Sequence, residues 1–377
     1  MKVAFLLGSL NRGGTETLLL SILKNLKSDQ FNAIVLYRKS GTLETEIKNT
    51  RFPVIKISDQ KSYFSYLKEL KKSIISNDVN IVHAQQPLDA LNAFLVCFGM
   101  KIPIILTLHG YDFFDKRLLS KLLLRIILPL TNVNFYVSQA QKEYYTKKYF
   151  LRNKNQKVLF NGIPLNEFIQ SNNSKKISEN NLRKQLNIEE NTLLLGCVGN
   201  FNEVRDQFTI CKFLKLLQNE TDNFHFVFVG GKVNNVPYFF DECVNFCDRN
   251  NLTSNVSFLG TRNDVSVLVS QFDAFVYSTN HDTFGIAVVE AMSVNVPVFV
   301  NDWIVMKEIT DNGKYATLFR TKDEVDLYEK FLLFLHDKSQ FLKKAQDASI
   351  HVLDNFSIEK HIENLTLEYL KFNIQKQ

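Results

Sequence analysis

The chain has 377 residues, of which 45% are hydrophobic and 22% are charged. That composition excludes a disordered chain, and the length suits two domains better than a single hydrophobic core. The formal net charge of +6 allows attraction to phosphates or to an anionic membrane, but it is too small to indicate nucleic-acid binding.

The cysteines and the N-terminal residues indicate a cytoplasmic protein. The five cysteines do not combine with histidines at zinc-site spacing, so we expect reduced thiols and no bound metal. The first residues lack the pattern of a cleavable leader, and no run of about 18 uncharged apolar residues occurs. We therefore expect neither a signal peptide nor a membrane-spanning helix.

Short apolar runs alternate with helical patterns in the first half of the chain. We expect strands near residues 3–7, 33–37, 80–83, 104–108, 134–137 and 158–160. We expect one helix that opens within residues 11–16 and runs to about 25, and another near 62–76. This alternation predicts a parallel sheet with helices on both faces. Ligands of such sheets bind beyond the carboxyl ends of the strands.

Candidate site residues follow some of these predicted strands. The first strand leads to Gly13 and Gly14, whose backbone N–H groups can face a diphosphate. Their spacing is that of neither a dinucleotide-binding turn nor a P-loop. His83 and His109 each close a strand, where a histidine is usually a hydrogen-bonded structural residue, and we expect this for His83. His109 precedes Gly110 and is the candidate for hydrogen bonding or proton transfer near neutral pH.

Residues 115–130 combine leucine and isoleucine with a repeated positive charge. Arg117, Lys121 and Arg125 recur at i,i+4 spacing, which places them on one side of a helix. The pattern is typical of a half-buried domain helix with a solvated basic stripe, or of an amphipathic helix on an anionic membrane. Both interpretations remain open at this point.

A polar stretch at 170–181 separates the two halves, and the strand–helix alternation then begins again. The predicted domains are 1–168, 169–355 and a C-terminal segment, 356–377. In the second half we expect strands near 193–198, 224–231, 255–261, 272–277 and 298–301, and helices from 323 onward.

The turn after the strand at 193–198 contains Asn200 and Arg205. Arg205 comes just before a helix, where its charge would complement a bound diphosphate. A surface salt bridge is the alternative role for Arg205. Arg262 follows the predicted strand at 255–261 and lies at another carboxyl end.

Segment 277–298 contains the pattern on which the functional hypothesis depends. A turn holds Asp282, a helix begins at Phe284 and Gly285, and Glu290 follows Asp282 by eight residues. A helix start offers unpaired N–H groups to a phosphate, and Gly285 lets the backbone come close. Two carboxylates near such an anion site suit a nucleotide sugar. The alternative is an ordinary crossover, in which Asp282 caps the helix and Glu290 is solvated.

This segment also resembles the acid-x7-acid signature of family-four retaining glycosyltransferases with GT-B architecture, E-G-F-G-x4-E-A-M. Asp282 stands for the first glutamate and Thr283 for a glycine, while Phe284, Gly285 and Glu290 match. The resemblance covers almost the whole chain in order: the G-G-x-E turn at 13–16, the His-Gly pair at 109–110, the Asn-Gly pair at 161–162, and V-G-R-x4-K-G with Asn200 and Arg205 at its basic positions.

The resemblance implies a GT-B fold, in which two Rossmann-like domains face a central cleft and the last helix packs on the N-terminal domain. It implies that Glu290 binds the donor ribose, that Asp282 binds the donor sugar, and that His109 lies near the anomeric carbon. Asn200 lacks the charge of the family's arginine, which Arg12 could supply. The other implied donor contacts are Gly13, Gly14, Arg205 at the phosphates, Arg262 near the base, and the amides of Phe284, Gly285 and Ile286.

We therefore expect a retaining glycosyltransferase that uses a UDP- or GDP-linked sugar and no other cofactor. Metal independence is expected because no Asp-x-Asp pair lies in a suitable turn. The expected acceptor is a glycan or a lipid-linked glycan of a bacterial capsule, O-antigen or exopolysaccharide, at the inner face of the plasma membrane. A catalytically silent nucleotide-sugar-binding scaffold subunit and a nucleotide-sugar epimerase of the same fold are the alternatives.

Overall fold

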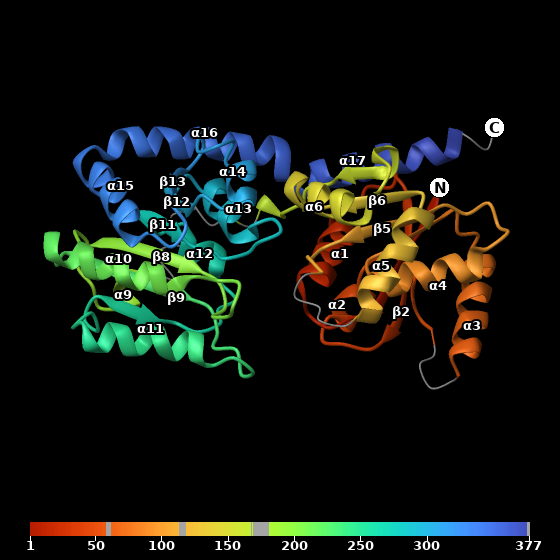
Figure 1. Cartoon of the computed structure of the whole chain (residues 1–377), viewed down its shortest axis with the longest axis horizontal. Helices are drawn as coiled ribbons and strands as arrows, with labels where there is room; N and C mark the ends of the chain where they lie inside the picture. Colours follow the sequence, from red (N-terminus) through yellow and green to blue (C-terminus); the bar gives the residue numbers. More distant parts are fainter. Residues whose placement is uncertain (58–61, 113–117, 167, 169–180, 375–377) are drawn as a thin grey trace. The chain divides into compact units, whose positions relative to one another are not determined.

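Two parallel sheets organise the chain in a computed structural model, which describes residues 1–57, 62–112, 118–166, 168 and 181–374 (Figure 1). Contacts divide the chain into an N-terminal unit, Met1–Ile163 with Phe356–Gln377, and a C-terminal unit, Pro164–Asn355. Each unit is described by itself below.

The N-terminal unit is a parallel sheet in the order β3-β2-β1-β4-β5-β6-β7. The strands are β1 (Lys2–Ser9), β2 (Asn32–Lys39), β3 (Val54–Lys56), β4 (Ile81–Ala84), β5 (Ile104–Leu108), β6 (Val133–Tyr136) and β7 (Gln156–Val158). The helices are α1 (Gly14–Asn25), α2 (Glu44–Lys48), α3 (Tyr63–Ser76), α4 (Pro87–Cys97), α5 (Leu118–Leu130), α6 (Gln139–Tyr149) and α17 (Ile358–Ile374).

Helices cover both faces of this sheet because successive side chains of each strand point to opposite sides. Phe5 of β1 belongs to a buried cluster with α1 and α17, whereas Leu6 belongs to a second cluster with α3 and α4. The last helix, α17, buries Ile358, Ile362, Leu365 and Tyr369 in the first cluster. Their spacing of three and four residues forms one apolar face, so the predicted packing of the last helix on the N-terminal domain is confirmed.

The C-terminal unit is a second parallel sheet, in the order β10-β9-β8-β11-β12-β13. Its strands are β8 (Leu193–Val198), β9 (Phe224–Val229), β10 (Val256–Phe258), β11 (Ala274–Tyr277), β12 (Val298–Asn301) and β13 (Thr317–Phe319). Its helices are α9 (Leu182–Gln185), α10 (Gln207–Glu220), α11 (Tyr238–Arg249), α12 (Val265–Val269), α13 (Ile286–Ser293), α14 (Ile304–Ile309), α15 (Glu324–His336) and α16 (Lys338–Phe356).

The predicted strand at 158–160 is displaced in the structure. The apolar run at 158–160 suggested the last strand of the N-terminal sheet, but β7 covers Gln156–Val158. Gln156 is buried because its side-chain oxygen accepts hydrogen bonds from Asn134 at 3.2 Å and from the Tyr136 hydroxyl at 2.7 Å. A polar residue satisfied in this way can occupy a buried strand, and an apolar pattern does not detect it.

Candidate functional site

The site in the C-terminal unit lies where the strand order reverses. β8 and β11 are neighbours, but the chain leaves β8 toward β9 and returns to β11 on the other side. The loops after the two strands are hydrogen-bonded to each other: Asp206 N–H donates to Ser278 O at 3.1 Å and Asn280 N–H donates to Val204 O at 2.9 Å. Such a switch point is where doubly wound sheets bind their ligands.

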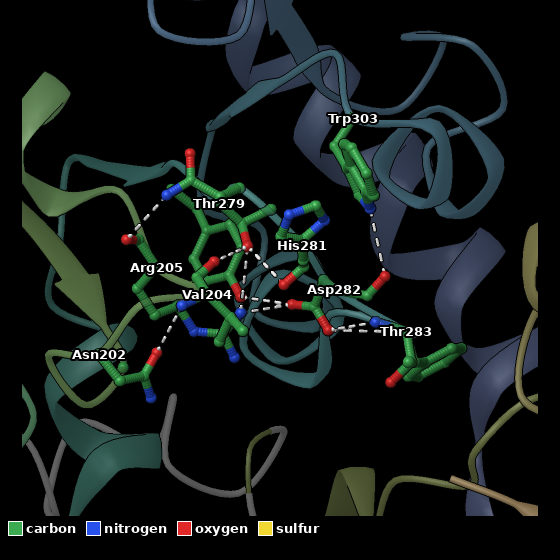
Figure 2. A network of polar contacts seen from close by, with 12 residues as sticks. Asn202, Val204, Arg205, Thr279, His281, Asp282, Thr283 and Trp303 are labelled. Carbon is green, nitrogen blue, oxygen red and sulfur yellow. Dashed lines mark hydrogen bonds and ion pairs between the residues drawn. The ribbon is translucent and has the colours of Figure 1, made fainter. Parts of the chain in front are cut away.

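Arg205 and Asp282 meet in this pair of loops (Figure 2). Arg205 Nη1 donates to Asp282 Oδ2 at 2.6 Å, and the Tyr277 hydroxyl donates to the same oxygen at 2.6 Å. The guanidinium also lies over the Tyr277 ring, with its carbon 5.1 Å from the ring centroid. A charged pair, a phenol and a cation–π contact thus fix one cation at the switch point.

Burial and charge determine the ionisation of this network. Burial alone would raise the pKa of Asp282, but the Arg205 charge and the hydrogen bond from Tyr277 outweigh it, so the pKa lies below its ordinary value. The pKa of Arg205 is raised: burial opposes its charge, but the neighbouring Tyr277 and Asp282 favour it more strongly. Both groups are therefore charged at neutral pH.

Asp282 also organises the start of α13. Its Oδ1 accepts hydrogen bonds from the backbone N–H groups of Thr283, at 2.8 Å, and Phe284, at 3.3 Å. Gly285 is the N-cap of α13 and has φ +88°, where a Cβ atom would lie 2.7 Å from Met306 Cε. Only glycine fits this position without strain. Asp282 therefore binds the turn that precedes the helix, and the capping role that was the alternative for Asp282 is wrong, because no side chain caps α13 at Gly285.

Glu290 lies on α13 as predicted, and Ile286 is the first residue of that helix, with 41% of its surface exposed. The amide of Phe284, expected to bind phosphate, donates to Asp282 in this structure. The roles of Glu290, Gly285 and Ile286 toward a donor remain predictions.

Two polar residues proposed for donor binding have partners within the unit. Asn200 Oδ1 accepts a hydrogen bond from the Gly231 backbone N–H at 2.8 Å, which joins the ends of β8 and β9. Arg262 donates two hydrogen bonds to Asp264, at 2.8 and 2.6 Å, so its charge is offset locally. Their contacts with a nucleotide remain predictions.

A glycine turn lies at the equivalent switch point of the N-terminal unit, between β1 and β4. Gly13 is the N-cap of α1 and Gly14 is its first residue. A Cβ atom on Gly13 would lie 2.8 Å from Glu16 Oε2, so this turn holds a buried carboxylate close to its backbone. Arg12, considered as a substitute cation, forms an exposed ion pair with Glu46.

His109 follows β5, and its Nε2 is hydrogen-bonded to Gln85 Oε1 at 3.0 Å. Burial and the nearby His361 lower the pKa of His109 to about 4. A neutral imidazole is therefore expected near pH 7, and the role of His109 toward a donor remains a prediction. His83 is confirmed as a structural residue, buried and hydrogen-bonded to Tyr369 at 2.6 Å.

Residues that the sequence pattern did not single out complete the network. Tyr277 ends β11 and reads as an apolar core position, yet its hydroxyl holds Asp282. Trp303 Nε1 donates to Asp282 O at 3.2 Å, and its ring meets His281 edge-on at 5.0 Å. Thr279 Oγ1 donates to Val204 O at 2.6 Å. A tyrosine at a strand's carboxyl end, next to the acidic turn, was the signal available for Tyr277.

Two general features bear on cofactors and membranes. Across the described ranges, no group of three or more His, Cys, Asp or Glu side chains is arranged to hold a metal ion. Within the same ranges, no helix is both long enough and apolar enough to cross a membrane.

Solved structures share this architecture over nearly their full length. Anabaena Alr3699/HepE in complex with UDP matches with a TM-score of 0.86 at 20% identity, covering 98% of this chain and 100% of that one. A glycosyltransferase from Rickettsia africae matches with a TM-score of 0.86 at 16% identity, covering 98% of each chain. Two Rossmann-like sheets with these neighbours define the GT-B fold.

The chain belongs to the group 1 glycosyltransferases. The family described as "Glycosyl transferases group 1" matches residues 178–351, and "Glycosyltransferase Family 4" matches residues 12–167. The O-antigen biosynthesis glycosyltransferase WclY of Escherichia coli is 23% identical over 92% of this chain and 96% of its own length. The UDP-Gal:alpha-D-GlcNAc-diphosphoundecaprenol alpha-1,3-galactosyltransferase of Escherichia coli is 22% identical over 96% and 95%.

Proposed function

We propose that this protein is a retaining, metal-independent glycosyltransferase of bacterial surface-polysaccharide biosynthesis. It transfers a sugar from a UDP- or GDP-linked donor to a hydroxyl of a lipid-linked glycan. The similar galactosyltransferase of Escherichia coli is named for a UDP-linked donor and a diphosphoundecaprenol-linked acceptor, and WclY for O-antigen biosynthesis. These names support the donor and acceptor classes.

The observation that carries the proposal is the fixed guanidinium of Arg205 at the switch point. Asp282 and Tyr277 hold it on one side, while 23% of its side chain stays exposed. A cavity of about 220 Å³ lies beside it, and Lys212 and Lys322 also line this cavity. Positive groups fixed before the reaction stabilise the charge that develops on a departing diphosphate. They take the place of a metal ion in the proposed mechanism.

The remaining predicted residues have separate tasks in this proposal. Glu290 binds the ribose hydroxyls, and the α13 amides at Gly285 and Ile286 meet the phosphates. In the N-terminal unit, Gly13 and Gly14 present backbone N–H groups to the diphosphate. Neutral His109 hydrogen-bonds the sugar near its anomeric carbon. Within the part of the chain that the structure describes, no side chain is an evident covalent nucleophile, so the acceptor attacks the face from which the diphosphate leaves.

A nucleotide panel tests the donor class directly. The melting temperature is measured with UDP, GDP, ADP and CMP, each alone and as its common sugar conjugate. A ligand of the folded state raises the melting temperature by mass action. We expect one base to respond, with slow hydrolysis of the corresponding nucleotide sugar. No response to any nucleotide would refute the proposal.

Glu290→Ala tests the assignment of the ribose-binding carboxylate. We expect transfer to be lost while the melting temperature without ligand changes little, because Glu290 is partly exposed. Glu329→Ala, an exposed glutamate on α15, is the matched control and should transfer normally. A fully active Glu290→Ala variant would remove the assignment.

Two observations support the scaffold alternative. Asn200 lacks a positive charge, and Asp282 is engaged with Arg205 rather than open to a ligand. This alternative would be favoured if the protein bound a nucleotide sugar but neither hydrolysed it nor transferred its sugar to any lipid-linked acceptor. An epimerase would instead interconvert the donor sugars without an acceptor.

The surface of helix α5 supports peripheral binding of this protein to an anionic membrane. Its inner side buries Leu124, Ile127 and Leu128, which agrees with the domain-helix interpretation. Its outer side exposes a row of apolar side chains: Leu118, Leu119, Leu122, Ile126 and Leu130. An exposed apolar row of this size is unusual on a soluble surface unless it binds something.

Positive charges flank this row. Lys121 and Arg125 have no ion-pair partner among the described residues. With Leu122 and Phe150 they line a groove of about 370 Å³. Phe150 is 90% exposed and is held at φ +53°, a strained conformation for this residue. Apolar side chains beside unpaired cations fit the boundary between lipid headgroups and acyl chains.

Liposome sedimentation tests this membrane interaction. Lys121→Glu with Arg125→Glu should abolish binding to phosphatidylglycerol vesicles, and the wild type should not bind phosphatidylcholine vesicles. Arg117, the third basic residue of the pattern, lies outside the described residues. Lys24→Glu with Lys27→Glu, two exposed lysines of the same unit, is the matched control. Absence of wild-type binding to the anionic vesicles would exclude the interaction.

A further inference from the structure

We infer that Asp282 acts on the donor through Arg205, as a positioning residue that Tyr277 assists, and does not itself bind the hydroxyls of the donor sugar. This inference rests on the proposed transferase function. It changes the role that the family resemblance implied for the first acidic residue, and it leaves recognition of the sugar to other groups.

The carboxylate of Asp282 has little capacity left for a ligand. Oδ2 accepts from Arg205 Nη1 and from the Tyr277 hydroxyl, both at 2.6 Å. Oδ1 accepts from the N–H groups of Thr283, at 2.8 Å, and Phe284, at 3.3 Å. A carboxylate offers about four lone-pair sites. A sugar hydroxyl would therefore have to displace a charged or backbone donor, and only 11% of this side chain is exposed.

The short side chain of Asp282 explains why its carboxylate bonds to its own loop. The resembled family has a glutamate at this position, whereas Asp282 has one methylene less. An aspartate readily hydrogen-bonds the backbone one and two residues further along, as Oδ1 does here with Thr283 and Phe284. These two bonds fix the carboxylate against its own loop. Its other oxygen then faces Arg205.

Arg205 is held on one edge and open on the other. Nη1 donates to Asp282, and to Thr279 Oγ1 at 3.4 Å, whereas Nε and Nη2 have no hydrogen-bond partner among the residues that the structure describes. Nε and Nη2 form the edge with which a guanidinium binds two oxygens of one phosphate. The Tyr277 ring, 5.1 Å from the guanidinium carbon, fixes the plane of the group.

A sugar-binding role and a positioning role for Asp282 predict different effects on the affinities for a nucleotide sugar and for the free nucleotide. A residue that touches the sugar contributes to binding of a nucleotide sugar and not to binding of the free nucleotide. A residue that positions Arg205 contributes equally to both, because both ligands contain the diphosphate. The ratio of the two affinities therefore separates a sugar contact from a positioning role.

Calorimetric titration with UDP and UDP-galactose provides this ratio. If the wild type responds to GDP in the melting-temperature panel, GDP and GDP-mannose are used instead. We expect Asp282→Asn to lower the affinity for both ligands by the same factor, about tenfold or more, because the amide places a hydrogen-bond donor against Arg205. Tyr277→Phe, which keeps the ring, should weaken both by a smaller equal factor. Unchanged UDP binding with weakened UDP-galactose binding would overturn the inference.

A double-mutant cycle with Arg205→Lys gives a second, independent test. Lysine keeps the charge but lacks the flat edge of the guanidinium. If Asp282 acts through Arg205, Asp282→Asn should have little further effect in the Arg205→Lys background. A full additional loss there would overturn the inference. Absence of nucleotide binding by the wild type would instead refute the proposed function, and the inference with it.

Discussion

A change from pH 7 to pH 5 tests the buried histidines that join α17 to the N-terminal sheet. His361 Nδ1 donates to Phe160 O at 2.6 Å, and 5% of its surface is exposed. Burial lowers the pKa of His361 to about 4, although the hydrogen bond to Phe160 opposes this shift. The pKa of His83 is lowered further, to about 3, by burial and the nearby His109 and His361.

The sign of the effect follows from proton binding. An unfolded histidine has a pKa of about 6.5 and binds a proton between pH 7 and pH 5. Folded His361 stays neutral over most of this range, so the unfolded state gains protons that the folded state does not. Stability is then complete above about pH 6.5 and falls as the pH falls, by about 2 kcal/mol for this residue at pH 5.

The substitution His361→Gln removes this titration while leaving a hydrogen-bond donor. The free energy of unfolding, from urea curves followed by circular dichroism, should fall about 2 kcal/mol less between pH 7 and pH 5 than in the wild type. Burial raises the pKa of Asp89 to about 7, which acts in the opposite direction, but this contribution is common to both proteins and cancels.

An internal control is available in the other unit. Trp303 is the single tryptophan and lies in the C-terminal unit, so its fluorescence follows unfolding of that unit alone. The His361→Gln variant should alter the circular-dichroism transition and leave the Trp303 transition unchanged. Equal losses of stability in His361→Gln and the wild type would refute the reasoning.

Two further substitutions have matched controls. Gly285→Ala should destabilise the protein by about 1–3 kcal/mol and weaken nucleotide binding, because φ is +88° and the new Cβ would overlap Met306. Its control, Gly14→Ala, should change the melting temperature little, because there is open space around Gly14. Leu365→Ala should remove about 2–5 kcal/mol from the free energy of unfolding, because this side chain is 0% exposed. The control Leu367→Ala should change the free energy of unfolding by less than about 1 kcal/mol, because Leu367 is 53% exposed. Equal urea midpoints for the two leucine variants would contradict the assignment of the buried face of α17.

The strands could be predicted from sequence where burial on both faces makes them continuous apolar runs. Three predicted ranges, 104–108, 193–198 and 298–301, coincide with β5, β8 and β12. Helices α4 and α11 are among those that were not predicted. α4 begins at Pro87 and is too uniformly apolar to show a clear period, and α11 opens with three aromatic residues that also suit a strand.

The amino-acid sequence alone, through the order of the motifs along it, was sufficient to predict two Rossmann-like domains and a glycosyltransferase family. It also located Asp282, Gly285 and Glu290 around one helix start, because local spacing fixes such positions. Only the tertiary structure decided that Asp282 is bound by Arg205, 77 residues away in the sequence, and by Tyr277. It also decided the burial that lowers the pKa of His109. Ion-pair partners and pKa values depend on distances and burial created by packing, which no local pattern contains.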